Sequence, residues 1–282
     1  MKKSMSPVKA RKLKHLWLLI GALLMLYPLL WLLKSSLTPE GQIMGSFSII
    51  PGDVTLENYE SGFRSGPGGG FPTYIVNSFI VVTGCVIGNL ISCSLAAYAF
   101  ARLDFRFKNT AFALMLAGIM LPYHVVAIPQ YIAFQEAGLV GTFWPLILPK
   151  LLATDAFFVF LMVQFLRGLP RSLDEAAAID GASPLRTFLS VILPLMKPAL
   201  ITTTIFTFIW NWNDFFMPLI YLTNPNQYTV PLGLSTLMST ESGAGLGPLF
   251  AMSVVSLIPV VAFFIFTQRY IIRGIATTGM KS

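Results

Sequence analysis

The chain has 282 residues, of which 55% are hydrophobic and only 11% are charged. Soluble domains carry about 25% charged residues, so this composition cannot supply the polar surface of a soluble globule. It excludes a disordered chain, a secreted disulfide scaffold and most soluble enzymes, and it predicts an all-α integral membrane protein with several spans. In a membrane protein the net charge of +7 is first of all a signal of topology, because positive charge collects on one side of the membrane.

Six segments are long and apolar enough to cross a bilayer, which needs about 20 residues. They are residues 15–33, 74–100, 110–132, 144–166, 198–222 and 247–270. Prolines interrupt the third, fourth and fifth of these segments, at Pro122, Pro129, Pro145, Pro149 and Pro218. Transmembrane helices tolerate proline where neighbouring groups satisfy the freed carbonyls, so we expect kinked helices there.

Lys and Arg are distributed unevenly between the connections. Sixteen of the nineteen fall in the N-terminal head, in the connections 101–109 and 167–197, and at the C-terminal end. The other three, Lys34, Arg64 and Lys150, are assigned to the opposite side. The positive-inside rule then places both termini in the cytoplasm, in agreement with an even number of spans.

The expected organisation follows from these spans. It is a cytoplasmic head at 1–14, a first transmembrane helix at 15–33, an extracytoplasmic loop at 34–73, a five-helix core at 74–270 that contains the cytoplasmic loop 167–197, and a cytoplasmic tail at 271–282. Cys85 and Cys93 lie too far apart along one expected helix to form a disulfide with each other. We interpret both as small packing residues.

The cytoplasmic loop 167–197 carries the clearest local signals. Ser172 and Glu175 have capping-box spacing, so a helix should begin just after Ser172. Gly181 can end that helix in a left-handed conformation, and Ser183 can cap a second helix with Pro184 at its first position. This pattern predicts a projecting elbow, which is either a docking site for a partner or a surface helix that reconnects two spans.

This loop resembles the EAA loop of the permeases of binding-protein-dependent ABC importers. The matching residues are Glu175, Ala176, Ala177, Gly181, Leu193 and Pro194, with Val191 where the family usually has Ile. The stretches 96–103, 210–215 and 268–274 are similar to the carbohydrate-uptake branch, and in particular to its shorter, maltose-transporter-type permease. The similarity extends over essentially the whole chain.

The resemblance implies a type I ABC importer permease fold in a bacterial or archaeal cytoplasmic membrane. It also implies a heterodimer with a second permease subunit, two ATP-binding subunits, and an extracytoplasmic solute-binding protein. This chain would hold no cofactor and would not be an enzyme, since ATP and Mg would bind to the ATPase subunits. The EAA loop would dock on these subunits, through Glu175, Ala176, Ala177, Asp180, Gly181, Ala182 and Pro194.

Two acids, Asp155 and Asp214, fall inside expected spans, where ionisable residues are costly and by default functional. Asp214 belongs to a run with Trp210, Asn211 and Asn213, which we expect on one continuous helix. Carboxylates and amides hydrogen-bond sugar hydroxyls, and aromatic rings cover sugar C–H faces. These four residues are therefore a candidate sugar path, although the same polar groups can instead join helices. Asp155 is expected to be hydrated near the outer end of its helix.

The loop 223–246 is polar and rich in turn-forming residues. In maltose-type transporters the corresponding loop can reach into the cleft of the binding protein. The candidate contacts on this chain are Thr236, Ser239 and Glu241.

Several kinds of site have no sequence signature. The chain has no GxxxxGK[ST] phosphate loop, no Cys/His cluster with zinc spacing and no GxSxG elbow. We therefore expect no metal and no catalytic residue. Anionic membrane lipid accounts for the basic head, so nucleic acid is not an expected partner.

The sequence thus predicts a permease subunit that translocates a sugar or oligosaccharide in an ATP-driven importer. One alternative is an ABC permease for a polyamine or for glycerol phosphate, although a phosphate group would require an intramembrane Lys or Arg. Another is a self-standing secondary transporter, which would require inverted repeats and would leave the EAA-like loop unexplained.

Overall fold

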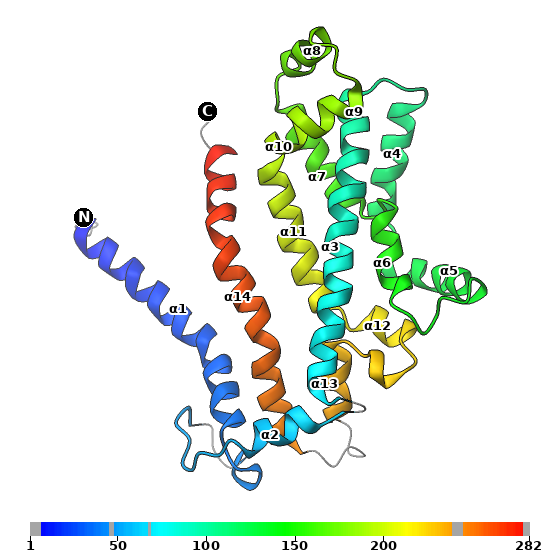
Figure 1. The fold of residues 1–282 in the computed structure, drawn as a ribbon. Coiled ribbons are helices and arrows are strands. Elements are labelled where there is room, and N and C mark those ends of the chain that lie inside the picture. Colours follow the sequence, from blue (N-terminus) through cyan, green and yellow to red (C-terminus); the bar gives the residue numbers. More distant parts are fainter. Residues whose placement is uncertain (1–6, 45–47, 67–68, 239–244, 279–282) are drawn as a thin grey trace. The chain divides into compact units, whose positions relative to one another are not determined.

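The computed structural model describes residues 7–44, 48–66, 69–238 and 245–278, and the regular structure in these residues is entirely helical (Figure 1). Four helical segments can each span a membrane by length and composition, and up to six can if two bent helix pairs each form one span. The chain divides into two compact units, Met1–Phe71 with Leu234–Leu257, and Pro72–Gly233 with Ile258–Ser282.

Four expected spans appear as continuous or nearly continuous helices. They are α1 (Pro7–Ser36), α3 (Phe71–Arg102), α6 (Trp144–Leu151) followed by α7 (Ala156–Arg167), and α14 (Leu246–Thr278). The α6–α7 pair counts as one span, Trp144–Arg167. These segments confirm the positions predicted from hydrophobicity. α1 begins well before its expected start at residue 15, and α14 continues well past its expected end at residue 270.

The third expected span is two helices rather than one kinked helix. α4 (Lys108–Ile119) and α5 (Tyr123–Glu136) meet at Pro122, and the pair is bent by 105°. Pro122 has extended backbone angles and no N–H to donate, so the helical hydrogen-bond pattern cannot continue through it.

The fifth expected span is also broken. α11 (Lys197–Trp212) ends at Asn213, and the short α12 (Phe216–Tyr221) follows. Pro218 explains the break, because it cannot donate the hydrogen bond that a continuous helix would direct to the carbonyl of Asp214. Where the sequence predicted one kinked helix over 198–222, the chain therefore forms two separate helices.

In the first unit, α2 (Glu57–Arg64) packs against two neighbours. The buried amide of Asn58 donates hydrogen bonds to the carbonyls of Ser36 and Thr38, at 3.0 and 2.8 Å. A Cβ atom added at Gly62 would lie 2.8 Å from the side chain of Met252. Glycine is therefore what allows α2 to approach the first part of α14 closely.

The second unit is built around α3, which lies beside α7 and α11 (Figure 1). The residues of this core are Cys93, Ala97, Tyr98, Ala101, Phe158, Val159, Met162, Val163, Leu166, Phe188, Ile192, Met196 and Ala199. Added Cβ atoms at Gly84 and Gly88 would lie 2.8 Å from Ile147 and 3.1 Å from the Lys150–Leu151 peptide. Small residues on α3 thus let α6 approach its backbone, as in other transmembrane bundles.

The remaining elements are short and connect these helices. They are 3₁₀ turns at Glu40–Gln42 and Pro225–Gln227, α8 (Ser172–Ile179), α9 (Pro184–Thr187), a π-helical turn at Phe188–Ile192, α10 (Leu193–Leu195) and α13 (Val230–Met238). Cys85 and Cys93 are both buried free thiols, as expected.

Candidate functional site: a projecting elbow and a polar cavity

The elbow begins with α8, whose N-terminus differs from the expected capping box. Arg171 occupies the N-cap position without a side-chain hydrogen bond, and Ser172 is already the first helical residue. The capping-box prediction was therefore wrong by one position. The helix still forms, because alanine favours it and because Asp174 and Glu175 place negative charge in its first turn.

The end of α8 confirms the predicted left-handed cap. Gly181 has φ +76°, which L-residues other than glycine rarely adopt. Its N–H donates to the carbonyl of Ala178 at 3.0 Å, and the N–H of Ala182 donates to that of Ala177 at 2.9 Å. These two bonds form a Schellman motif, which ends the helix and reverses the chain.

The second half of the elbow also has its predicted cap. The hydroxyl of Ser183 accepts a hydrogen bond from the N–H of Arg186 at 3.4 Å, and Pro184 is the first residue of α9. The π-helical turn and α10 then lead to α11, with a bend of 75°. Gly181 and Ser183 therefore determine the turn between α8 and α9.

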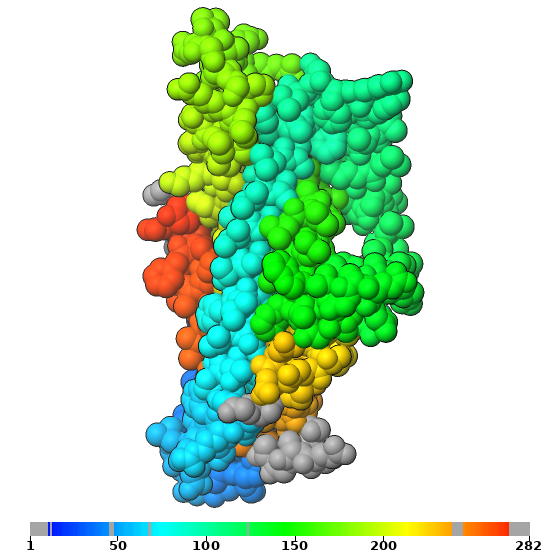
Figure 2. Space-filling model, turned by 45° about the vertical axis from the view of Figure 1, so that its right-hand side comes forward, coloured from blue at the N-terminus to red at the C-terminus, as the bar shows by residue number. Residues whose placement is uncertain are grey.

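The outer face of the elbow is exposed and largely small or apolar. Figure 2 shows it standing out at one end of its unit. Glu175, Ala176, Asp180, Gly181 and Pro194 are exposed, Ala182 is partly exposed, and Ala177 is turned inward. Ile179 lies beside this face with 87% of its surface accessible. The tip of the elbow thus presents one large apolar side chain among alanines and acidic residues.

The inner face of the elbow is anchored to the end of α3. The guanidinium Nε of Arg102 lies 3.2 Å from the carboxylate of Asp174, and the two side chains are 5% and 23% exposed. The Nη2 of Arg102 donates a hydrogen bond to the carbonyl of Leu169 at 3.0 Å. The exposed face and the anchored face of α8 are therefore distinct.

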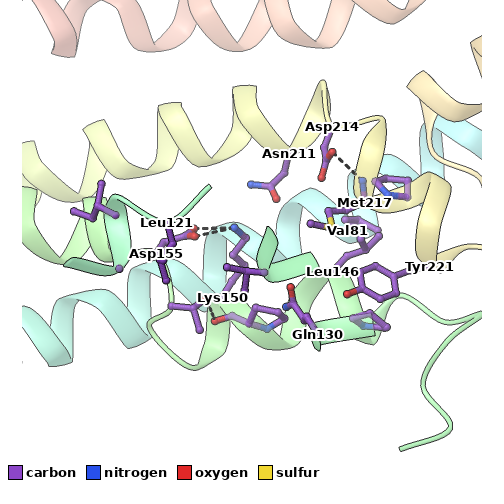
Figure 3. Close-up of a pocket in the computed structure, with 17 residues that line it drawn as sticks. Val81, Leu121, Gln130, Leu146, Lys150, Asp155, Asn211, Asp214, Met217 and Tyr221 are labelled. Carbon is purple, nitrogen blue, oxygen red and sulfur yellow. Dashed lines mark hydrogen bonds and ion pairs between the residues drawn. The ribbon is translucent and has the colours of Figure 1, made fainter. Parts of the chain in front are cut away.

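A second candidate site is a cavity of about 450 Å³ in the same unit (Figure 3). Residues from α3, α4, α5, α6, α11 and α12 line it. Its polar lining includes Gln130, Lys150, Asp155, Asn211, Asp214 and Tyr221, and the rest is mostly apolar.

One wall of the cavity is a partly buried ion pair. The Nζ of Lys150 lies 3.0 and 2.9 Å from the two carboxylate oxygens of Asp155. Asn89 of α3 donates a hydrogen bond to the same carboxylate at 2.7 Å and another to Thr207 at 3.1 Å. This network joins α3, the α6–α7 junction and α11.

These contacts correct two expectations. Asp155 is paired with Lys150 and Asn89, whereas the sequence indicated a merely hydrated carboxylate. Lys150 lies within the candidate span Trp144–Arg167, whereas the charge count assigned it simply to the outer side of the membrane. The span therefore does hold a lysine, but an acid already neutralises it.

Two of the four candidate sugar-path residues line the cavity. Asn211 lies in the last turn of α11, and Asp214 lies in the break between α11 and α12. The Oδ1 of Asp214 accepts a hydrogen bond from the N–H of Met217 at 3.3 Å, and the amide of Asn211 donates one to the carbonyl of Thr207 at 2.7 Å.

The other two candidates are not part of the lining. Trp210 is half-exposed and packs against the rings of Phe157, Phe158 and Phe206. Asn213 is exposed and donates a hydrogen bond to the carbonyl of Ile209 at 2.8 Å. The sequence indicated one helix face shared by Trp210, Asn213, Asp214 and Met217, with Asn211 beside it. Of these residues, Asn211, Asp214 and Met217 line the cavity, and Trp210 and Asn213 do not.

The cavity includes polar residues that the sequence analysis did not single out. Gln130 comes from α5, Lys150 from α6 and Tyr221 from α12, so no local motif connects them. Of the candidate binding-protein contacts, Thr236 is half-buried in α13, while Ser239 and Glu241 lie outside the described residues.

The sequence is similar to a family of transport proteins and to named sugar permeases. Residues 88–277 match the family described as "Binding-protein-dependent transport system inner membrane component". An arabinooligosaccharides transport system permease protein of Halalkalibacterium halodurans is 35% identical and covers 100% of both chains. A trehalose/maltose transport system permease protein of Thermococcus litoralis is 32% identical over 95% of this chain and 98% of the relative.

A solved structure has the same fold. It is a bacterial ABC transporter involved in the import of the acidic polysaccharide alginate, with a TM-score of 0.83 and 24% sequence identity. The match covers 96% of this chain and 99% of that one. At this identity the likeness establishes the fold alone.

Proposed function

We propose a function for this chain from the premise that it belongs to the binding-protein-dependent transport system inner membrane component family. It is the permease subunit that carries a sugar or oligosaccharide through an ATP-driven importer, and the elbow around α8 couples it to the ATPase. The observation that carries this proposal is the exposed, glycine-capped α8 in a chain of this family.

Family membership by itself defines the general role. The chain is a multi-pass component of the inner membrane and a transport subunit rather than an enzyme. Proteins of this family work in a complex with ATPase subunits and a binding protein. This excludes the self-standing secondary transporter.

Sugar is the proposed substrate class because of the named relatives. Permeases named for arabinooligosaccharides and for trehalose and maltose align with essentially the whole of this chain. Glycerol phosphate fits the cavity less well, because the carboxylate of Asp155 already neutralises Lys150.

The proposed coupling surface consists of Glu175, Ala176, Ala177, Asp180, Gly181, Ala182 and Pro194, joined by Ile179. Small side chains allow the ATPase to approach the backbone of α8 closely, and Ile179 supplies apolar contact. The acidic residues give the surface a negative charge on a side of the membrane that the positive-inside rule otherwise makes basic. Both termini lie on that cytoplasmic side.

The mechanism follows from this attachment. ATP binds with Mg to two partner subunits, and their closure displaces α8. Because α8 is anchored to α3 and leads directly into α9 and α11, its displacement reaches the helices that line the cavity. A second permease completes the path, and the solute-binding protein releases the sugar on the opposite side, where loop 223–246 contacts it.

Co-purification tests this proposal. An affinity-tagged chain should recover a second permease and an ATPase, and the complex should accumulate a labelled neutral sugar when its binding protein is supplied. Glu175→Ala should reduce ATPase recovery or coupled uptake by about tenfold, because it removes a charge from the docking face. Glu136→Ala changes an equally exposed glutamate on α5 and should behave as wild type.

Two results would contradict the proposal. A functional complex that lacks an ATPase would refute the importer role. Normal ATPase recovery and uptake in both glutamate variants would refute the coupling role of α8 but leave the sugar assignment standing.

A further inference from the structure

We propose that the 450 Å³ cavity is a binding subsite for one uncharged sugar ring, in which Tyr221 and Gln130 are specificity-determining contacts. This inference rests on the proposed function, because it presupposes that the chain handles sugars. It adds that this chain holds part of the sugar site itself and that the site favours neutral sugars over acidic ones.

The hydroxyl of Tyr221 is the first observation. Tyr221 is 1% exposed, and its ring is held by Tyr131 at 6.0 Å and by Phe134 at 5.7 Å between centroids. Among the described residues no hydrogen-bond partner for its hydroxyl is found. Leaving such a group without a hydrogen bond costs about 1–3 kcal/mol. A ligand in the cavity that hydrogen-bonds to this hydroxyl would recover that free energy.

The hydroxyl of Tyr221 faces a second polar side chain of the cavity. Figure 3 shows it pointing from α12 toward the side chain of Gln130, which projects into the same cavity from α5. An amide offers two donors and an acceptor, and a phenol offers one donor and accepts as well. Together they match a sugar hydroxyl, which both donates and accepts.

The size and the apolar lining also suit a sugar ring. Small-molecule sites usually measure about 300–1,000 Å³ and combine apolar walls with a few placed polar groups. Here Val81, Leu146 and Met217 supply apolar surface, and Asp214 adds a further acceptor at the rim of the helix break. A pyranose has the same combination, with C–H faces and a hydroxylated edge.

The charges of the lining select against acidic sugars. Lys150 is the one cation among the lining residues, and both oxygens of Asp155 already contact it. Asp214 contributes a second carboxylate, so the formal charge of the lining is negative. A uronate would bring another carboxylate without a free cation to pair with it, and burying such a charge is strongly unfavourable.

Ligand-observed NMR tests the subsite. The complete transporter, with partner permease and ATPase subunits in nanodiscs but without binding protein, is mixed with maltotriose or with trigalacturonate. Saturation transfer should be strong for maltotriose and weak for trigalacturonate. Tyr221→Phe, which keeps the packed ring, should reduce the maltotriose signal about fivefold, as expected for one lost hydrogen bond. Tyr131→Phe removes a hydroxyl outside the lining and should leave the signal unchanged.

Each opposite result overturns the subsite. These results are no maltotriose signal, an equal trigalacturonate signal, or an unchanged signal in Tyr221→Phe.

Uptake of maltotriose, arabinotriose and galactotriose by wild-type proteoliposomes with binding protein separates the subsite proposal from the proposed sugar function. If none of the three is carried, the sugar function fails. If one is carried while Tyr221→Phe binds and transports as wild type, the subsite alone fails.

Discussion

Arg102, the last residue of α3, forms an ion pair with Asp174 in the first turn of α8, at 3.2 Å. Neither carboxylate oxygen of Asp174 accepts a directed hydrogen bond among the described residues, so the charge of Arg102 is what stabilises this mostly buried acid. The pair connects a helix of the membrane core to the proposed coupling surface.

Breaking this pair should weaken both stability and coupling. Arg102→Ala leaves Asp174 without a cation, and an uncompensated buried charge costs about 3 kcal/mol. We expect lower thermal stability and fewer sugar molecules transported per ATP hydrolysed, measured on purified transporter in proteoliposomes. The exchange Arg102→Asp with Asp174→Arg should restore part of the transport-to-hydrolysis ratio.

The matched control for that experiment lies a few residues further along the chain. Asp104 pairs with Lys108 at 3.4 Å but is 90% exposed, and such surface pairs contribute little. Asp104→Ala should therefore match wild type in both readouts. If it impairs coupling as much as Arg102→Ala does, the Arg102–Asp174 pair has no special role.

Gly181→Ala should cost about 1 kcal/mol from backbone strain alone, since a new Cβ would meet nothing within 4 Å. Gly138 has φ +68° and equally open surroundings, so Gly138→Ala should cost about the same. We expect the two variants to lose equal thermal stability, and only Gly181→Ala to lose ATPase coupling. Equal coupling in both would show that the conformation of the α8 cap does not matter for docking.

The Lys150–Asp155 pair predicts that a second substitution restores stability lost by the first. Lys150→Met leaves Asp155 without a cation near the cavity, so it should strongly destabilise the protein, by about 3 kcal/mol. Lys150→Met combined with Asp155→Leu removes both charges and should be more stable than the single variant, as judged by thermal unfolding in detergent. A double variant that is less stable than Lys150→Met would mean that the network stabilises the fold by something other than charge pairing.

Glu40 binds the start of α14 with both carboxylate oxygens. Each accepts a hydrogen bond of 2.6 Å, from the N–H groups of Leu246 and Gly247. Glu40→Ala should cost about 1 kcal/mol, because these amides then lack a partner at a helix N-terminus. Hydrogen exchange at Leu246 and Gly247 should accelerate by about fivefold, and unchanged exchange would contradict this.

Glu60→Ala provides the control for Glu40. Glu60 forms an exposed ion pair with Arg64 on α2, in the same unit, and contacts neither of the two amides. Exchange at Leu246 and Gly247 should therefore stay at the wild-type rate in this variant.

Local sequence rules predicted the elbow well. The conformation of Gly181 and the cap made by Ser183 and Pro184 depend on neighbouring residues, so spacing alone was sufficient. The N-cap of α8 was predicted at Ser172 but is Arg171, one residue earlier. Arg171 makes no capping hydrogen bond with its side chain, so the sequence carried no signal for it.

The cavity could not be predicted in the same way. The break after Trp212 had a visible signal in Pro218, but apolar length favoured one continuous span. The Lys150–Asp155 pair depends on a helix break at which Ala153 adopts φ +54°, and no pattern indicated that conformation. Gln130 and Tyr221 line the same cavity only because of the tertiary fold, so no sequence pattern connects them.

Cysteine cross-linking at the tip of α8 tests directly whether this helix docks on the ATPase subunit at the cytoplasmic side of the membrane. Ile179→Cys is placed in a background in which the buried Cys85 and Cys93 are replaced by serine, and Ile50→Cys in the long N-terminal loop serves as the control. Ile179→Cys should cross-link to the ATPase subunit in a nucleotide-dependent manner, and an impermeant maleimide added to spheroplasts should label only Ile50→Cys. Labelling of Ile179→Cys from outside, or no cross-link to the ATPase in any nucleotide state, would contradict this prediction.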